Sequence, residues 1–251
     1  MQRSRTQRTR LGTQMGTPTS TRSGGFTIIE LMIVVVLIAI LASIALPNML
    51  SARVAANETA AIASLRTISS AQAQYQVAGR ADVDVDGTGE FGTLSELAGS
   101  RASRTDATGA TAATSIPPAV LSRAFGILNA NGEATKSGYL FRAFLPGQGG
   151  GNTTESAVNG DLSASVDVDT SETIWCIYAW PEGAARSGNR TFFINQRGDI
   201  SATTGVYSGT QALDTGNAGA AFEAGSATTA ITGATALGVV AVDGNLWTST
   251  R

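Results

Sequence analysis

The sequence contains no histidine among its 251 residues. It therefore cannot build Ser-His-Asp or Cys-His nucleophile pairs, histidine general bases or histidine-ligated zinc sites. Cys176 is the single cysteine, so no intrachain disulfide, Cys-x-x-Cys redox pair or thiolate cluster can form. Its apolar neighbours indicate a buried side chain rather than a reactive thiol. These absences favour a protein that is not an enzyme.

Charge is also scarce, at 14% of residues, and it is unevenly distributed. Residues 1–25 hold five arginines and no acidic residue, which leaves 12 basic against 19 acidic residues in the remainder. The remainder is therefore acidic, with a side-chain charge of about −7 at standard pKa values. Because such a chain offers no basic surface, we expect no nucleic-acid partner.

One long, mainly apolar run extends from Phe26 to Leu46 and contains a single charge, Glu30. As a helix, these 21 residues span roughly 31 Å, enough to cross a hydrocarbon core of about 30 Å once. The arginines before the run place the N-terminus in the cytoplasm and the C-terminal bulk outside. A carboxylate in such a segment is costly and is usually kept because it finds a partner.

The stretch Gly25-Phe26-Thr27-Ile28-Ile29-Glu30-Leu31, followed by the apolar helix and Pro47, resembles the N-terminus of type IV prepilins. This family includes major and minor pilins and the pseudopilins of type II secretion. The resemblance implies a leader peptide over residues 1–25, cleavage after Gly25 and N-methylation of Phe26. It also implies an essential role in assembly for Glu30, the fifth residue of the processed chain. The competing interpretation is a secretory signal, which has a shorter apolar core and a small-residue cleavage site.

A physical argument supports a role for Glu30. Cleavage would create an α-amine on Phe26 that is positively charged near neutral pH, one helical turn from this carboxylate. Glu30 can offset that charge within one subunit, or pair with a neighbouring subunit's amine and fix the axial register. A buried charge specifies an arrangement because the wrong arrangement leaves it unpaired. The alternative is a helix-terminal glutamate that the headgroup region simply tolerates.

The remaining pattern predicts an α+β fold, in which a long N-terminal helix packs on a C-terminal antiparallel sheet. The helix comprises a transmembrane or filament-core part, 26–46, and an amphipathic part, 47–78, which begins at the bend expected of Pro47. Gly79 is the expected C-terminal cap, and 79–251 form a globular extracytoplasmic domain. Within this domain, aromatic and β-branched runs predict strands, and a stretch rich in Ala, Gly and Thr predicts a C-terminal part that is flexible apart from some edge strands. The expected strands cover residues 138–145, 172–180 and 190–195, with a short helix over 120–128 and the flexible part over 201–251.

An acidic stretch follows the helix. Asp82, Asp84 and Asp86 alternate before Gly87, as in the first half of a calcium-binding loop, and Glu90 can contribute a further ligand. The full EF-hand pattern requires an acidic residue at the twelfth position, which is Thr93 here. The sequence thus predicts a candidate calcium site, against the alternative of a solvated acidic turn.

The function expected from these features is that of a pilin-like subunit of a type IV pilus or a type II secretion pseudopilus. The resemblance implies other pilin or pseudopilin subunits, a prepilin peptidase and methyltransferase, and an inner-membrane assembly platform with an ATPase as partners. Before assembly, the chain is expected to cross the inner membrane once. The alternative is a single-pass anchored binding module that does not polymerise. An anchored hydrolase is disfavoured because no convergent catalytic motif is present.

Overall fold

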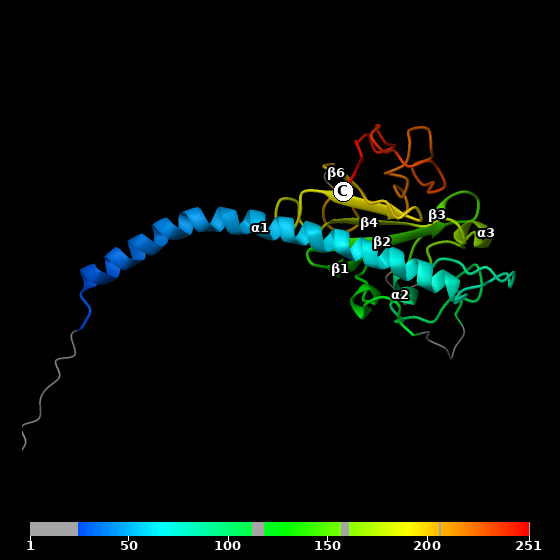
Figure 1. Cartoon of the computed structure of the whole chain (residues 1–251), viewed down its shortest axis with the longest axis horizontal. Coiled ribbons are helices and arrows are strands. Elements are labelled where there is room, and N and C mark those ends of the chain that lie inside the picture. Colours follow the sequence, from blue (N-terminus) through cyan, green and yellow to red (C-terminus); the bar gives the residue numbers. More distant parts are fainter. Residues whose placement is uncertain (1–24, 112–117, 157–160, 206, 251) are drawn as a thin grey trace, which may run out of the picture. The chain divides into compact units, whose positions relative to one another are not determined.

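The computed structural model describes residues 25–111, 118–156, 161–205 and 207–250. The chain forms two compact units, Met1–Leu46 and Pro47–Arg251. The leader before Gly25 lies outside the described residues. A long helix and an antiparallel sheet confirm the predicted α+β class (Figure 1).

Helix α1 runs from Ile28 to Val77 and contains Pro47 in its interior. It ends one residue before the predicted end at residue 78. Gly79 adopts φ +54°, a left-handed conformation that glycine reaches without a side-chain clash. The Gly79 N–H donates to the Gln76 carbonyl at 2.8 Å, which satisfies one of the last helical carbonyls. The predicted C-terminal cap is therefore confirmed.

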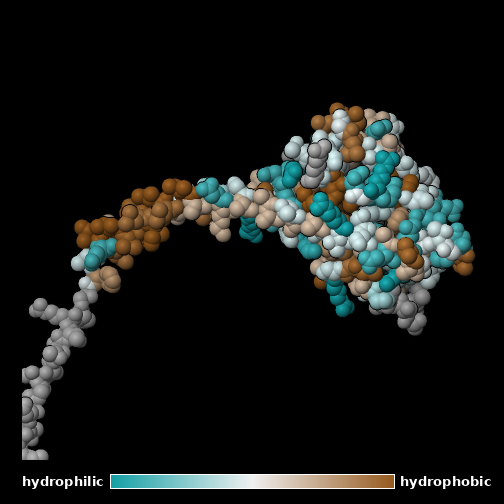
Figure 2. Space-filling view, viewed as in Figure 1, coloured by the Kyte–Doolittle hydropathy of each residue, from teal (hydrophilic) through white to brown (hydrophobic). Residues whose placement is uncertain are grey.

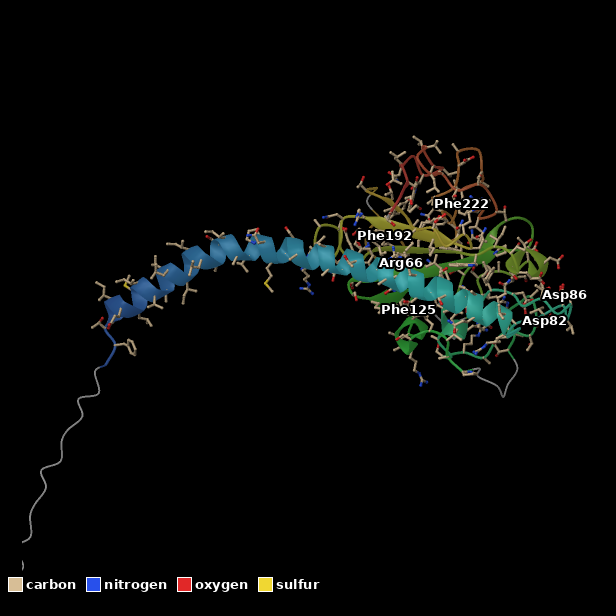
Figure 3. The ribbon with its side chains drawn as sticks, in the orientation of Figure 1. Arg66, Asp82, Asp86, Phe125, Phe192 and Phe222 are labelled. Carbon is tan, nitrogen blue, oxygen red and sulfur yellow. The ribbon has the colours of Figure 1, made fainter. Side chains whose placement is uncertain are left out.

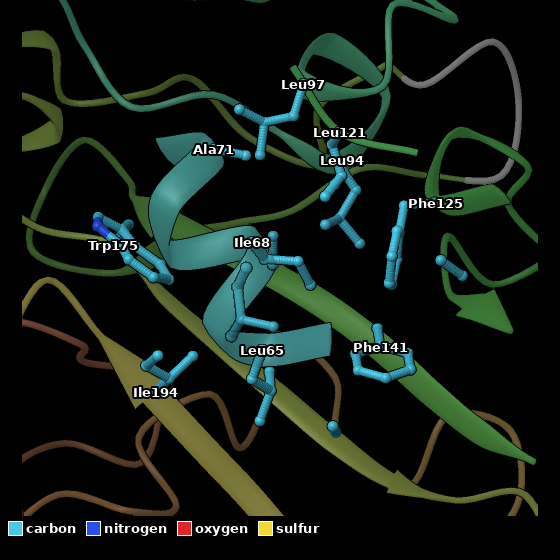
Figure 4. Close-up of a cluster of buried hydrophobic side chains, with 14 of the residues drawn as sticks. Leu65, Ile68, Ala71, Leu94, Leu97, Leu121, Phe125, Phe141, Trp175 and Ile194 are labelled. Atoms are coloured by element: carbon cyan, nitrogen blue, oxygen red, sulfur yellow. The ribbon is translucent and has the colours of Figure 1, made fainter. Parts of the chain in front are cut away.

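The part of α1 after Pro47 buries one apolar stripe against the rest of the second unit, to which it belongs, as its periodicity predicted. Leu65, Ile68 and Tyr75 are fully buried. Figure 4 shows Leu65 and Ile68 among side chains from the sheet and from the segments that follow the helix. This packing explains why the helix persists over polar sequence, since tertiary burial contributes more to helix stability than intrinsic propensity does.

Polar contacts fix the position of this part of α1. Glu58 accepts hydrogen bonds from Arg190 Nε at 2.8 Å and from the Asn189 N–H at 2.9 Å. Further along, the buried Gln72 amide donates to the Gly92 carbonyl at 2.7 Å and accepts from the Gly92 N–H at 2.9 Å. A buried amide paired in both directions costs little, whereas another register would leave it unpaired.

The sheet is antiparallel throughout, and its strand order is β1-β2-β4-β5-β6-β7, with β3 paired to β2. The strands are β1 Ala134–Lys136, β2 Tyr139–Pro146, β3 Asn152–Thr153, β4 Cys176–Pro181, β5 Thr191–Asn195, β6 Ser201–Thr203 and β7 Thr248–Ser249. The turn between β1 and β2 has two residues of positive φ, Ser137 at 51° and Gly138 at 73°. That conformation matches the twist of a tight hairpin.

The central strands are buried on both faces. Side chains alternate along β2 and β4, so that Phe141 and Ile177 join the core under α1, whereas Phe144 and Tyr178 enter a second core. Because successive strand side chains point to opposite faces, this alternation places the two cores on opposite sides of the sheet.

The second core is built mainly by the C-terminal segment. Its residues Leu213, Phe222 and Trp247 are fully buried among the aromatic side chains of the sheet, and β7 pairs with β6. Sequence reasoning described residues 201–251 only as partly packed and did not predict this core. The sequence pattern of residues 201–251 gave little indication of a core, because small Ala, Gly and Thr residues surround the few large apolar side chains.

Two local predictions need correction. The strand expected over 172–180 begins only at Cys176, because Asp167 caps a short helix, α3 Val168–Ser171, by accepting from the Thr170 N–H at 3.1 Å. The helix expected over 120–128 is a single 3₁₀ turn, η1 Arg123–Gly126.

A buried polar network surrounds helix α2, Leu94–Leu97. Glu96 Oε2 accepts from the Thr93 N–H at 2.8 Å and also binds Arg104 Nη1 at 2.8 Å. Beside it, both carboxylate oxygens of Glu155 accept from the Ser95 N–H at 3.2 Å. The pKa of Glu155 is raised to about 6, chiefly by burial, with a smaller contribution from the negative charge of Glu96. Hydrogen bonds from Ser95 and Thr93 oppose the shift.

The raised pKa of Glu155 predicts a specific pH dependence of stability. The folded chain keeps this proton to a higher pH than the unfolded chain, where the usual value is 4.5. The contribution of protonated Glu155 to the free energy of unfolding is fully present below the pKa of the unfolded chain and is lost as pH rises through about 6. The free energy of unfolding of wild type minus that of Glu155→Gln should fall by about 2 kcal/mol from about pH 4 to 7, because only the wild type loses stability as this carboxyl ionises. Urea unfolding of both full chains in detergent measures this difference. A difference that stays constant or grows would contradict this assignment.

The second core also makes a testable prediction. Trp247 is fully buried, with ring centroids 6.0 Å from Tyr178 and 6.1 Å from Phe193. Replacing it by alanine should cost about 3–5 kcal/mol of the free energy of unfolding, because a large buried cavity remains. Leu246→Ala is a matched control, since Leu246 is 51% exposed and should cost less than about 1 kcal/mol. Equal small losses in the two variants would show that the C-terminal segment is not part of the folded core.

Candidate functional site

The first candidate is the N-terminal unit, where α1 exposes large apolar side chains on every face. Between residues 25 and 50 no residue is buried, and Ile28, Leu41 and Ile44 are each at least 66% exposed. Figure 2 shows the N-terminal part of α1 as mostly apolar on the face in view, with hydrophilic atoms near its start. By length and composition α1 contains a stretch that can cross a membrane, none of it buried within the chain. An uncovered apolar surface of this size requires lipid or other protein around it.

Glu30 has a defined role at the start of this helix. Its carboxylate accepts hydrogen bonds from the Thr27 N–H and hydroxyl, both at 3.1 Å, while the Thr27 hydroxyl accepts from the Glu30 N–H at 3.2 Å. This reciprocal arrangement is a capping box, with Thr27 as the N-cap. Glu30 therefore helps to define where α1 begins and presents its charge at the N-terminal end of the apolar segment.

Pro47 lies where the fully apolar part of α1 gives way to the amphipathic part. It has no N–H, so the carbonyl of Ser43 loses its usual helical partner. The Ser51 hydroxyl donates to the Pro47 carbonyl at 3.2 Å, one turn further on. Neighbouring helices can accommodate such a defect in a membrane or a bundle.

The second candidate is the acidic loop after α1, residues 82–90. One carboxylate oxygen from each of Asp82, Asp84 and Asp86 lies within 4.8 Å of the others. Figure 3 places Asp82 and Asp86 close together near the C-terminal end of α1. Backbone turns shape the loop: the Thr88 N–H donates to Asp86 Oδ1 at 2.7 Å, and Gly87 adopts φ +93°.

Two glutamates approach the same loop. Glu90 is fully buried, and its Oε1 accepts from the Val83 N–H at 2.8 Å. Glu172, at the start of the segment leading into β4, is half-buried. The pKa of Glu90 is raised mainly by burial, and Asp84 adds to the shift, whereas the Val83 N–H opposes it. The pKa of Glu172 is raised by burial first and then by Asp86, Asp84 and Glu90.

The predicted site residues therefore form two separate groups. Gly25, Phe26, Glu30 and Pro47 belong to the N-terminal helix, and the acidic residues form one cluster that also includes Glu90. Sequence reasoning missed Glu172, for which no local signal exists because it is distant in the chain. It also missed the capping partner Thr27, which the Thr-x-x-Glu pattern could have identified.

Two family comparisons match different parts of the chain. The prokaryotic N-terminal methylation motif matches residues 20–46. The family described as "Protein of unknown function (DUF2950)" matches residues 42–204, more than half of the chain. The chain belongs to the DUF2950 family. In this DUF2950 protein the family match covers α1 from its fifteenth residue through strand β6, and the matched region ends before most of the second core.

A curated relative supports the type IV pilin-like nature of the N-terminal segment of this DUF2950 protein. The "Type IV wide pilus major component PilA4" of Thermus thermophilus is 49% identical over 53 residues, which are 21% of this chain and 40% of the relative. The chain thus spans less than half the length of that relative. No solved structure matches the chain. Together with the methylation motif, this match shows that the N-terminal segment is similar to that of type IV pilin-like proteins.

Proposed function

We propose that this protein is a structural subunit of an envelope filament, processed after Gly25 and polymerised through its N-terminal helix. The observation that carries the proposal is the apolar surface of residues 26–46, which the rest of the chain leaves uncovered. Lipid covers that surface before assembly, and the same segments of neighbouring subunits cover it in the filament. Similarity to a type IV wide pilus component favours a type IV pilus over a secretion pseudopilus.

Glu30 would act at two stages. In the single subunit its carboxylate caps the helix through Thr27. After cleavage, the new amine on Phe26 would lie within one turn of Glu30, either in the same subunit or in a neighbour. A carboxylate surrounded by apolar helices is stable only where a cation is placed beside it, so this pairing would define the axial step between subunits.

Other parts of the proposal follow from the same segment. A prepilin peptidase and methyltransferase would act on Gly25 and Phe26, and an inner-membrane platform with an ATPase would extract the subunit from the membrane. Before assembly, the N-terminus would lie in the cytoplasm and the unit after Pro47 outside. An anchored module that never polymerises remains the alternative, and filament formation distinguishes the two.

Glu30→Gln separates the two roles of this residue. Glutamine also supports a capping box, so the helix and its membrane insertion should be retained. The charge is lost, and the yield of sheared, sedimentable filaments should fall by at least about tenfold, equivalent to about 1.4 kcal/mol of pairing energy. Immunoblots of the sheared and membrane fractions measure the yield.

Two matched controls sharpen this experiment. Thr27→Ala removes the cap but keeps the charge, and should reduce filament yield less than Glu30→Gln does. Asp199→Asn removes one exposed charge from the second unit and should leave the yield unchanged. Wild-type yield from Glu30→Gln would contradict the pairing role, and a wild-type chain that never sediments as filaments would favour the anchored module.

A further inference from the structure

Unsatisfied carboxylate oxygens gather at the acidic loop. Six side-chain polar atoms in the described part of the chain are buried without a hydrogen-bond partner, and three of them are Asp82 Oδ1, Glu90 Oε2 and Glu172 Oε1. Buried polar atoms in folded proteins normally find partners, and an unpaired carboxylate oxygen is especially costly. Three such oxygens on adjoining segments form a group of acceptors that suits a cation.

Glu90 gives the strongest indication because it is 0% exposed. One of its oxygens accepts from the Val83 N–H at 2.8 Å, so the carboxylate is directed at the backbone between Asp82 and Asp84. Its second oxygen has no partner. A buried carboxylate beside other carboxylates is costly unless a positive charge compensates it. A cation between the Glu90 carboxylate and the aspartates of the loop would supply that charge.

Glu172 is held beside the loop from the other side. The Phe91 N–H donates to the Ser171 carbonyl at 2.9 Å, and the Gln76 side chain of α1 donates to the Glu172 carbonyl. These contacts tie the residue to both the end of the acidic loop and the end of α1.

The loop itself has dimensions that suit calcium. Calcium–oxygen distances of about 2.3–2.6 Å place ligand oxygens on opposite sides of an ion about 5 Å apart. The three aspartate oxygens, all within 4.8 Å of one another, fit around one such ion. Gly87 supplies the sharp turn at the sixth position of the loop, and Glu90 occupies the ninth.

We propose that the side chains of Asp82, Asp84, Asp86, Glu90 and Glu172 bind one calcium ion. Glu172 replaces the acidic ligand that a calcium loop normally carries at its twelfth position, occupied here by Thr93. Carboxylates from two chain segments suit the irregular, oxygen-rich coordination of calcium better than the strict octahedron of magnesium. The bound ion joins the C-terminal end of α1 to the segment that enters β4.

Calcium binding to the full-length protein in detergent tests this proposal. After treatment with EDTA and its removal, calcium chloride should raise the Tm by about 5–10 °C at a concentration about 100 times the Kd. Isothermal titration calorimetry with the same salt should give one site per chain. Magnesium chloride at equal concentration should give a clearly smaller shift.

The variants test which residues are ligands. Glu172→Gln should weaken calcium binding by at least about tenfold, because a charged oxygen ligand is lost. Asp169→Asn is the matched control, since it removes the same charge from an exposed position three residues away. It should change the calcium affinity less than about threefold, because a surface charge is screened by solvent. Asp86→Asn, also at an exposed position, should weaken binding as Glu172→Gln does.

Three results would overturn the proposal. Absence of both a titration heat and a Tm shift at about 5 mM calcium would exclude a site with the affinities of extracellular calcium modules. Equal shifts with calcium and magnesium would show only general screening of the acidic loop. Wild-type affinity in Glu172→Gln, together with loss of binding in Asp86→Asn, would remove Glu172 from the site. Filament formation is not measured in any of these experiments, so their failure leaves the proposed assembly role unaffected.

Discussion

The need to keep residues 26–46 out of water governs the rest of this protein. Each large apolar side chain moved out of water contributes about 1.5–3 kcal/mol, and this segment presents them on every face without a partner in its own chain. A solitary chain in water would therefore aggregate. Lipid or other protein must cover this segment, and Glu30 presents a carboxylate at its N-terminal end, where Thr27 caps the helix with it.

After Pro47, the same helix carries apolar side chains that the chain itself covers. There its apolar residues form one stripe that is buried against a sheet, and Glu58 and Gln72 fix the register through paired polar contacts. The sheet in turn is covered on its other face by the C-terminal segment. One continuous helix thus connects a segment that depends on its surroundings to a unit that satisfies its own core.

The sequence was most informative where a single physical requirement acts locally. The apolar run, the cap at Gly79 and the aromatic strands each follow from neighbouring residues, and the structure confirms the helix end and most strand positions. It was least informative where distant segments meet. Trp247 completes a core with strands far earlier in the chain, and Glu172 reaches the acidic loop from a segment about 80 residues away. No local period or spacing encodes such contacts.

The central claim is that the chain becomes a filament subunit only after processing at Gly25. The most direct measurement is the intact mass and N-terminal sequence of the protein recovered from cell envelopes. The account predicts a chain that begins at an N-methylated Phe26. A chain that retains the residues before Gly25, or one cleaved near Ala45 as a secretory signal would be, would contradict it.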